Sequence, residues 1–182
     1  MKSVGVFCSA SNKIDVRYFR APHELGVWLG RNGIRLVYGG SCLGLMEEIA
    51  RSANEAGGRV LGVVPSKLVE GDHVSSYNTE VINCNNLSDR KDIMFRESDL
   101  LLALPGGIGT VDEIFHVMGS ATIGYHRKRM VLFNVEGYWN GLMDMLRGMQ
   151  ANGFINAPLE TYVVSVDTIE ELEQLISEIP DK

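Results

Sequence analysis

The chain has 182 residues, of which 45% are hydrophobic and 22% are charged. These proportions are typical of one globular domain and exclude a disordered chain, a coiled coil or a collagen. Seventeen Lys and Arg residues stand against 23 Asp and Glu residues, a net charge of −6, so no positive field draws in nucleic acid or an anionic membrane. A phosphate ligand must therefore be held by local geometry.

The three cysteines, Cys8, Cys42 and Cys84, are widely spaced and form no Cys-x-x-Cys pair. They predict neither a disulfide framework nor a zinc site, and no metal is expected. The segment Met1–Phe7 lacks the long apolar region of a secretion signal, and no apolar run approaches the roughly 18 residues that span a bilayer. We therefore expect a cytoplasmic protein without a membrane partner.

Short apolar segments alternate along the chain with longer segments of helical period. Strands are predicted at Ser3–Cys8, Ile34–Tyr38, Arg59–Val64, Glu80–Asn83, Asp99–Leu104, Lys128–Asn134 and Thr161–Val166. Helices are predicted at Asp15–Asn32, Gly44–Ala56, Ser88–Glu97, Val111–Ile123, Tyr138–Asn152 and Thr168–Ile179. Several of the strands are apolar at consecutive positions, as are parallel strands buried on both faces.

This alternation predicts an α/β fold, a doubly wound parallel sheet between two layers of helices. Residues 1–182 contain no repeat, low-complexity tract or linker, so a single three-layer domain is expected. In such folds ligands bind beyond the carboxyl ends of the strands. Ser9, directly after the first strand, either donates a hydrogen bond to a phosphate there or simply begins a turn.

The second predicted strand leads into the glycine-rich segment Gly39–Gly44. Its spacing resembles a Walker A loop, but Leu45 and Met46 replace the required lysine and hydroxyl residue. A dinucleotide fingerprint fails as well, because a serine replaces its second glycine, and this disfavours a dinucleotide-dependent oxidoreductase. Gly39 and Gly40 therefore belong either to a tight strand-to-helix turn or to a backbone cradle for a sugar phosphate.

Arg90 and Lys91 follow Ser88, a candidate N-cap, and are expected in the first turn of a helix. Cations there oppose the helix dipole by about 0.3–1 kcal/mol each. One interpretation is a solvated charged face on which neighbouring aspartates offset this cost. The other is that both side chains point toward a ligand, where Arg binds a phosphate or a sugar hydroxyl.

A second glycine-rich segment, Pro105-Gly106-Gly107-Ile108-Gly109-Thr110-Val111-Asp112-Glu113, joins a buried strand to a helix. Glycines let the backbone approach a ligand closely, and the unpaired N–H groups of a first helical turn attract anions. Thr110 and Glu113 also fit a capping box, which would explain both by helix-end chemistry alone. Because Pro-Gly-Gly-x-Gly precedes them, we favour a phosphate site with Glu113 within reach of the attached sugar.

This segment matches the PGGxGTxxE motif of the Lonely Guy family, the cytokinin riboside 5′-monophosphate phosphoribohydrolases, and the resemblance covers nearly the whole chain. Val6–Ser11 is similar to the family's opening strand and loop, and Leu36–Gly40 with Gly44-Leu45-Met46 to its glycine loop. Arg90-Lys91 with Met94 resembles its R-K-x-x-M segment, and Asn134–Trp139 its N-V-x-G-Y-[YW] turn.

The resemblance implies a Rossmann-like, homodimeric enzyme without a cofactor. Such an enzyme hydrolyses the N-glycosidic bond of a nucleoside 5′-monophosphate to the free base and ribose 5-phosphate. It implies catalytic roles for Glu113 and Arg90. Substrate binding is then expected at Lys91, Gly106, Gly107, Gly109, Thr110, Ser9, Gly39, Gly40 and Met94. Related proteins have also been labelled lysine decarboxylases, but no lysine here is identifiable as a pyridoxal phosphate anchor.

Several departures from the family pattern concern the side of the site expected to hold the base. Leu87-Ser88 replaces Met-His, Glu47 replaces a small residue, and Gly119-Ser120-Ala121-Thr122 replaces a T-W-A-Q segment whose Trp helps to shape the base pocket. AMP is therefore as well suited as an N6-substituted AMP, such as a cytokinin riboside monophosphate. The alternative function is a non-catalytic nucleotide or cofactor carrier on the same fold.

Overall fold

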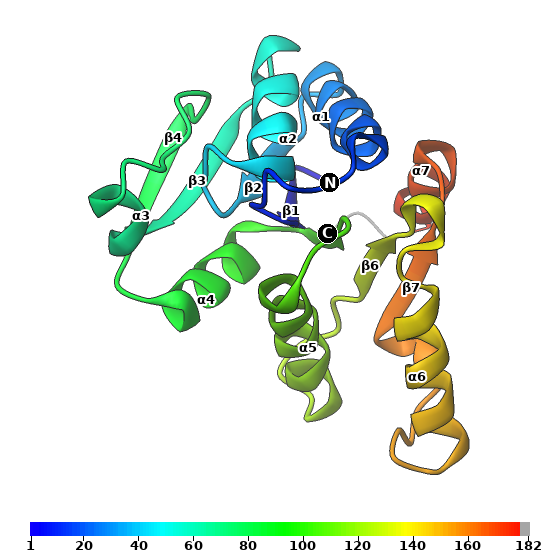
Figure 1. The fold of residues 1–182 in the computed structure, drawn as a ribbon. Coiled ribbons are helices and arrows are strands. Elements are labelled where there is room, and N and C mark those ends of the chain that lie inside the picture. Colours follow the sequence, from blue (N-terminus) through cyan, green and yellow to red (C-terminus); the bar gives the residue numbers. More distant parts are fainter. Residues whose placement is uncertain (179–182) are drawn as a thin grey trace.

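The computed structural model describes residues 1–178, apart from the side chain of Leu68. Its centre is a parallel sheet, which within these residues has seven strands in the order β4-β3-β2-β1-β5-β6-β7 (Figure 1). The strands are β1 (Ser3–Phe7), β2 (Arg35–Tyr38), β3 (Val60–Pro65), β4 (Glu80–Cys84), β5 (Leu100–Ala103), β6 (Met130–Phe133) and β7 (Val163–Val166). The chain winds to one side of β1 and then, from β5, to the other, which confirms the predicted doubly wound sheet.

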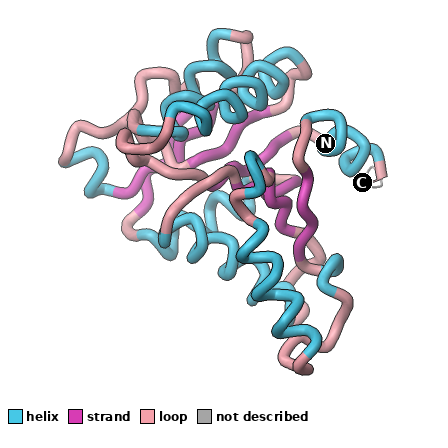
Figure 2. The backbone as a smooth tube through the Cα atoms, turned by 45° about the vertical axis from the view of Figure 1, so that its right-hand side comes forward, coloured by secondary structure: helices cyan, strands magenta, loops and turns pink. Residues whose placement is uncertain are grey.

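Helices cover both faces of this sheet (Figure 2). They are α1 (Arg20–Arg31), α2 (Gly44–Glu55), α3 (Ser66–Glu70), α4 (Leu87–Glu97), α5 (Ile108–Thr122), α6 (Asn140–Ala151) and α7 (Ile169–Ser177). Buried side chains of α1, α2 and α7 form one core cluster with the sheet, and those of α4, α5 and α6 form a second. The molecule therefore has the three layers that the sequence predicts.

Strand β1 shows how one central strand supplies both layers. Val4 and Val6 belong to the cluster with α1 and α2, whereas Phe7 belongs to the cluster with α4 and α5. All three side chains are buried, since successive residues of a strand point to opposite faces and both faces are covered. This double burial explains why the strand is apolar at consecutive positions.

Helices α1 and α4 begin elsewhere than predicted because of the way their amino ends are capped. The Asp15 side chain accepts a hydrogen bond from the Arg17 N–H and caps a short 3₁₀ helix, η1 (Val16–Phe19), so that α1 begins only at Arg20. Helix α4 is capped by Asn86, whose Oδ1 accepts from the N–H groups of the two residues after Leu87 at 2.9 Å. Arg90 and Lys91 therefore lie two residues further into α4 than predicted.

The other differences are small. Helix α5 begins at Ile108 and not at Val111, and α3 is a five-residue helix that the sequence analysis did not predict. Two further 3₁₀ helices, η2 (Val135–Gly137) and η3 (Leu159–Thr161), flank α6. The predicted end of the last helix, at residue 179, lies outside the described residues.

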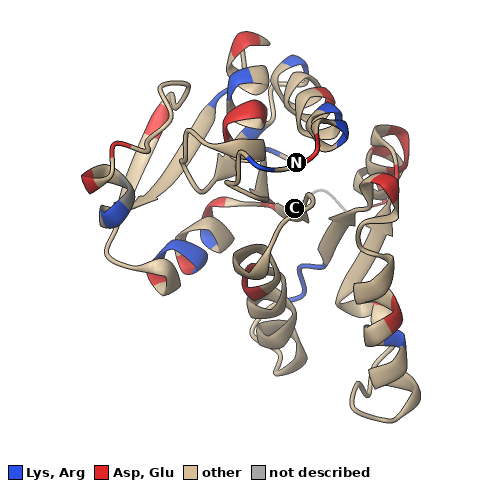
Figure 3. Ribbon diagram, in the orientation of Figure 1, with Lys and Arg blue, Asp and Glu red and all other residues tan. Residues whose placement is uncertain are grey.

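Charged residues of both signs are mixed along α1, α2 and α4 (Figure 3). This mixture of signs is consistent with the net charge of −6. Positive charge near a ligand therefore comes from individual Lys or Arg side chains. In the part of the chain that the structure describes, no helix is both long enough and apolar enough to cross a membrane.

Candidate active site

The loop after β1 meets the Pro105–Glu113 segment at the carboxyl edge of the sheet, where the winding direction reverses. Strands β1 and β5 are neighbours, with Phe7 opposite Ala103. Beyond them the Ser9 N–H donates to the Pro105 carbonyl at 3.2 Å. Ser9 therefore lies beside the start of the Pro105–Glu113 segment, at the switch point where ligands bind in doubly wound folds.

The amino terminus of α5 presents unpaired backbone N–H groups. Gly107 occupies the N-cap position, and among the described residues no side chain caps the helix. The first helical hydrogen bond runs from the Val111 N–H to the Gly107 carbonyl at 3.0 Å, so the N–H groups of residues 108–110 lack intrahelical acceptors. Thr110 lies inside the first turn and is buried, so the capping-box interpretation is wrong. The helix end is suited to bind an anion.

Gly106 and Tyr138 fix the path of the chain into α5. A Cβ atom on Gly106 would lie 2.5 Å from the Cβ of Thr110, so only glycine fits there. The Tyr138 hydroxyl donates to the Gly106 carbonyl at 2.7 Å, and its ring packs edge-on against Tyr18 and Trp139. Tyr138 thereby orients the residue that precedes the unpaired N–H groups.

We expect Tyr138→Phe to raise the KM for a nucleotide by about three- to tenfold and to change kcat less. The substitution removes one hydrogen bond, worth about 0.5–1.5 kcal/mol, from the backbone next to the phosphate site. Steady-state kinetics of the variant measure this, with Tyr125→Phe, an exposed tyrosine, as the control. A fall in kcat at unchanged KM would contradict a positioning role.

Arg90 of α4 and Glu113 of α5 form a buried ion pair. Arg90 Nη2 donates to Glu113 Oε1 at 2.6 Å, and only 12% and 4% of the two side chains are exposed. A Cβ atom on Gly39 would lie 3.1 Å from Arg90 Nη1, so the end of β2 also borders the guanidinium. Arg90 therefore does not belong to a solvated face. Its buried Nε has no hydrogen-bond partner in the described part of the chain, so this donor of the guanidinium is unsatisfied.

Burial raises the pKa of the Glu113 carboxyl above its usual value of 4.5, and the charge and hydrogen bond of Arg90 oppose this rise without cancelling it. The carboxylate is desolvated on nearly all sides, and loss of hydration disfavours its charged form. A carboxylate with a raised pKa is a stronger base than one in water. Glu113 is therefore suited to accept a proton from a water molecule.

The raised pKa gives a pH prediction. Glu113 acts as a base only when ionised, so activity should fall as the pH drops through its pKa. The acid limb of the kcat/KM profile, which reports groups of the free enzyme, should thus lie above pH 4.5. Arg90→Gln removes the charge that lowers this pKa, so the limb of its residual activity should shift to higher pH. A limb at or below pH 4.5 would exclude Glu113 as the titrating base.

Lys91 lies near the same end of α5, where its side chain forms an ion pair with Asp112. Its Nζ donates to Asp112 Oδ2 at 2.7 Å, and 13% of the lysine side chain is exposed. Together with the Arg90–Glu113 pair, this contact joins the first turns of α4 to those of α5. Lys91 can reach a phosphate at α5 only by sharing or leaving Asp112.

The Gly39–Gly44 loop uses its backbone for internal contacts. The Cys42 N–H donates to the His73 carbonyl at 2.9 Å, and the Gly44 N–H donates to Asn12 Oδ1 at 2.8 Å. Gly40 has a φ of +77°, and a Cβ there would lie 2.5 Å from Val64 Cγ2. These contacts favour the strand-to-helix turn over the phosphate cradle, although Gly39 still borders Arg90.

Two further residues, Met94 and Cys8, are buried. Met94 is only 1% exposed and packs in the core with α5. Cys8, which the sequence analysis did not select, is buried at the end of β1. Burial and the nearby Glu113 carboxylate raise the pKa of its thiol. Its position at the end of the first predicted strand, Ser3–Cys8, was the available signal.

Comparison with known proteins indicates the same family as the sequence motifs. A family model described as possible lysine decarboxylase matches residues 46–176. The chain is 37% identical to cytokinin riboside 5′-monophosphate phosphoribohydrolase LOG5 of Arabidopsis thaliana over 95% of this chain and 76% of the relative. It is 35% identical to the probable phosphoribohydrolase LOGL3 of Oryza sativa over 97% and 84%.

Two solved structures share the fold. A structural genomics target, TM1055, has a TM-score of 0.76 at 26% identity and covers 98% of this chain and 100% of its own. The Moco carrier protein from Chlamydomonas reinhardtii has a TM-score of 0.74 at 24% identity over 98% and 99%. The second likeness concerns the fold alone.

Proposed function

Since the chain belongs to the Lonely Guy family of phosphoribohydrolases and is accordingly an enzyme that acts on nucleoside 5′-monophosphates, we propose that it hydrolyses AMP and N6-substituted AMP to the free base and ribose 5-phosphate. The observation that carries this proposal is the buried Arg90–Glu113 pair beside the uncapped amino terminus of α5. A general base and an anion-binding site lie next to each other there. Hydrolysis of a phosphorylated sugar requires both.

The phosphate binds to the free N–H groups at residues 108–110, with Lys91 adding positive charge. Arg90 binds the ribose or the phosphate through its guanidinium and holds Glu113 in place. Binding energy from the phosphate positions C1′ for attack, although the phosphate itself does not react.

Cleavage of the N-glycosidic bond passes through a state with positive charge on the sugar and negative charge on the base. The Glu113 carboxylate stabilises the positive sugar and takes a proton from the attacking water. The water oxygen bonds to C1′, the bond from C1′ to the base nitrogen breaks, and the base leaves with that electron pair and is then protonated.

The experiment is a substrate panel of AMP, GMP, CMP, IMP and N6-substituted AMP, followed for release of ribose 5-phosphate. Adenosine is the matched control, because it lacks the phosphate and should be cleaved at least about a hundredfold more slowly. Binding of the nucleotides without turnover would instead favour the carrier function.

We also propose that the chain forms a homodimer, as the family resemblance implies. Ile108, in the first turn of α5, is 91% exposed, and Ile123 and Tyr125 at the opposite end of that helix are exposed as well. Exposed apolar side chains of this size commonly mark protein interfaces. Light scattering should give twice the chain mass of 20.1 kDa, and a monomer would refute the proposal.

A further inference from the structure

The ion pair between Lys91 of α4 and Asp112 of α5 is unequally exposed. Lys91 Nζ donates to Asp112 Oδ2 at 2.7 Å, and 13% of the lysine side chain is exposed, against 58% of the aspartate side chain. In the part of the chain that the structure describes, Asp112 is the only hydrogen-bond partner of the Lys91 ammonium. The lysine is therefore largely withdrawn from water, whereas the carboxylate that holds it remains hydrated.

This pair lies close to the anion-binding end of α5. Thr110 is the last of the three residues whose backbone N–H groups lack intrahelical acceptors. Asp112 follows it by two positions, a rise of about 3 Å along a helix. The charges of Lys91 and Asp112 both act on the Glu113 carboxyl. A phosphate bound at residues 108–110 would therefore lie within reach of the flexible Lys91 side chain.

A bound phosphate and Asp112 would compete for the one ammonium group of Lys91. A phosphate monoester carries about two negative charges at neutral pH, against one on a carboxylate, so it attracts the lysine more strongly. Asp112 gives up the lysine at little cost, because its exposed carboxylate is hydrated when the pair opens and ion pairs open to water contribute little. The pair is therefore suited to open when a phosphate binds and to close when it leaves.

We propose, on the basis of the proposed function, that Asp112 competes with the substrate phosphate for Lys91 and thereby limits the affinity of the site for phosphorylated sugars. Asp112 is thus a positioning residue, which acts through Lys91 and contacts no reacting atom. The product, ribose 5-phosphate, keeps the phosphate of the substrate, so a contact that tightens substrate binding there also tightens product binding. By taking Lys91 back, Asp112 favours product release.

Asp112→Asn removes the competing carboxylate and keeps a side chain of nearly the same size. Its Kd for ribose 5-phosphate, measured by calorimetry, should be about three- to tenfold lower than that of wild type. Asp112→Glu restores a carboxylate that pairs with Lys91, so its Kd should lie within about twofold of wild type. An Asp112→Asn variant that binds ribose 5-phosphate no more tightly than wild type would overturn the proposal.

The dependence on Lys91 is tested in a second background. Lys91→Met keeps an unbranched apolar side chain but removes the charge. In that background, Asp112→Asn should change the Kd for ribose 5-phosphate by less than about twofold, since water and salt screen an exposed carboxylate. A gain of equal size with and without Lys91 would mean that Asp112 only repels the phosphate, and it would overturn the proposal.

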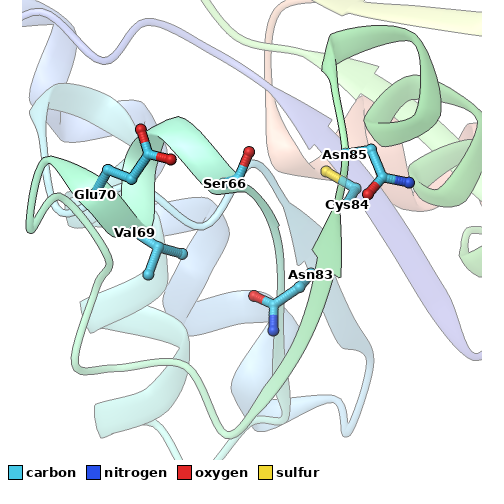
Figure 4. Close-up of a pocket in the computed structure, with 6 residues that line it drawn as sticks. All are labelled: Ser66, Val69, Glu70, Asn83, Cys84 and Asn85. Atoms are coloured by element: carbon cyan, nitrogen blue, oxygen red, sulfur yellow. The ribbon is translucent and has the colours of Figure 1, made fainter.

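Two control variants separate this effect from the loss of any ion pair or of any negative charge. Asp92→Asn breaks the 3.3 Å contact between Asp92 Oδ1 and His116 Nε2, which also joins α4 to α5. Glu70→Gln removes a charge from the groove between α3 and the end of β4 (Figure 4), where Glu70 pairs with none of the described residues. Both variants should bind ribose 5-phosphate as wild type does. A gain in either as large as that in Asp112→Asn would contradict the proposal.

Turnover of AMP gives a readout that a merely structural role would not move. Asp112 raises the pKa of the Glu113 carboxyl, whereas Arg90 and Lys91 lower it. The acid limb of kcat/KM should therefore shift to lower pH in Asp112→Asn, and an unmoved limb in an active variant would count against the proposal. If wild type binds ribose 5-phosphate but cleaves no monophosphate, the proposed function fails, and the binding experiments still decide the role of Asp112.

Discussion

Glu113→Gln should reduce base release from AMP by about a thousandfold, within the range for loss of a positioned acid or base, and should leave nucleotide binding largely intact. The amide still accepts a hydrogen bond from Arg90 but neither takes a proton nor stabilises positive charge on the sugar. Single-turnover assays of base release, together with calorimetry of AMP binding, separate the two effects.

The same substitution should leave the free energy of unfolding within about 1 kcal/mol of wild type, because the raised pKa means that the folded protein favours the neutral form of this group, and the amide still accepts the hydrogen bond from Arg90. Thermal unfolding followed by circular dichroism measures this. Glu24→Gln, an exposed glutamate paired with Arg20 on α1, is the control and should change neither activity nor stability appreciably. Wild-type rates in the Glu113→Gln variant would remove Glu113 from the mechanism.

Gly106→Ala should abolish nucleotide binding and destabilise the fold by about 1–3 kcal/mol, the typical cost of overpacking. The added methyl group would overlap the side chain of Thr110, which is buried. The chain must then shift at the point where it enters α5, and the N–H groups at residues 108–110 lose their alignment. Denaturant titration and AMP calorimetry are the measurements.

Gly107→Ala is the matched control for the fold. A Cβ atom there would have nothing within 4 Å, and the backbone φ is −91°, so its free energy of unfolding should stay within about 1 kcal/mol of wild type. If both alanine variants unfold alike, the close contact with Thr110 is not what demands glycine at position 106.

The sequence predicted the sheet and its layers because strands that are buried on both faces have a recognisable sequence pattern. Strands such as β1 and β5 are apolar at consecutive positions, and helices with one buried face separate them. It was less informative about helix starts. Asn86 and Ser88 are both good caps, and only the folded backbone shows that the Asn86 side chain reaches the N–H groups.

For the site, the motif indicated Glu113 and Arg90, but not that they contact each other at 2.6 Å. That contact joins residues 23 positions apart on different helices, so no local pattern encodes it. Likewise, Tyr138 was noticed only through the family resemblance. Its bond to Gly106 spans 32 positions. Helix α3 was not predicted because a five-residue helix leaves little periodicity to detect.

The central position of β1 has a consequence for how this enzyme becomes active. Val4 pairs with Leu36 on one side and with Leu100 on the other, so the first strand of the chain needs a partner that follows almost a hundred residues later. Pairings so distant in sequence form late and slowly. Glu113 follows β5, so Arg90 and Glu113 come together only once this last central pairing has closed. During refolding, the helical circular dichroism signal should therefore recover before base-release activity does. The recovery of this activity would then measure the pairing of β1 with β5, which joins the two halves of the sheet.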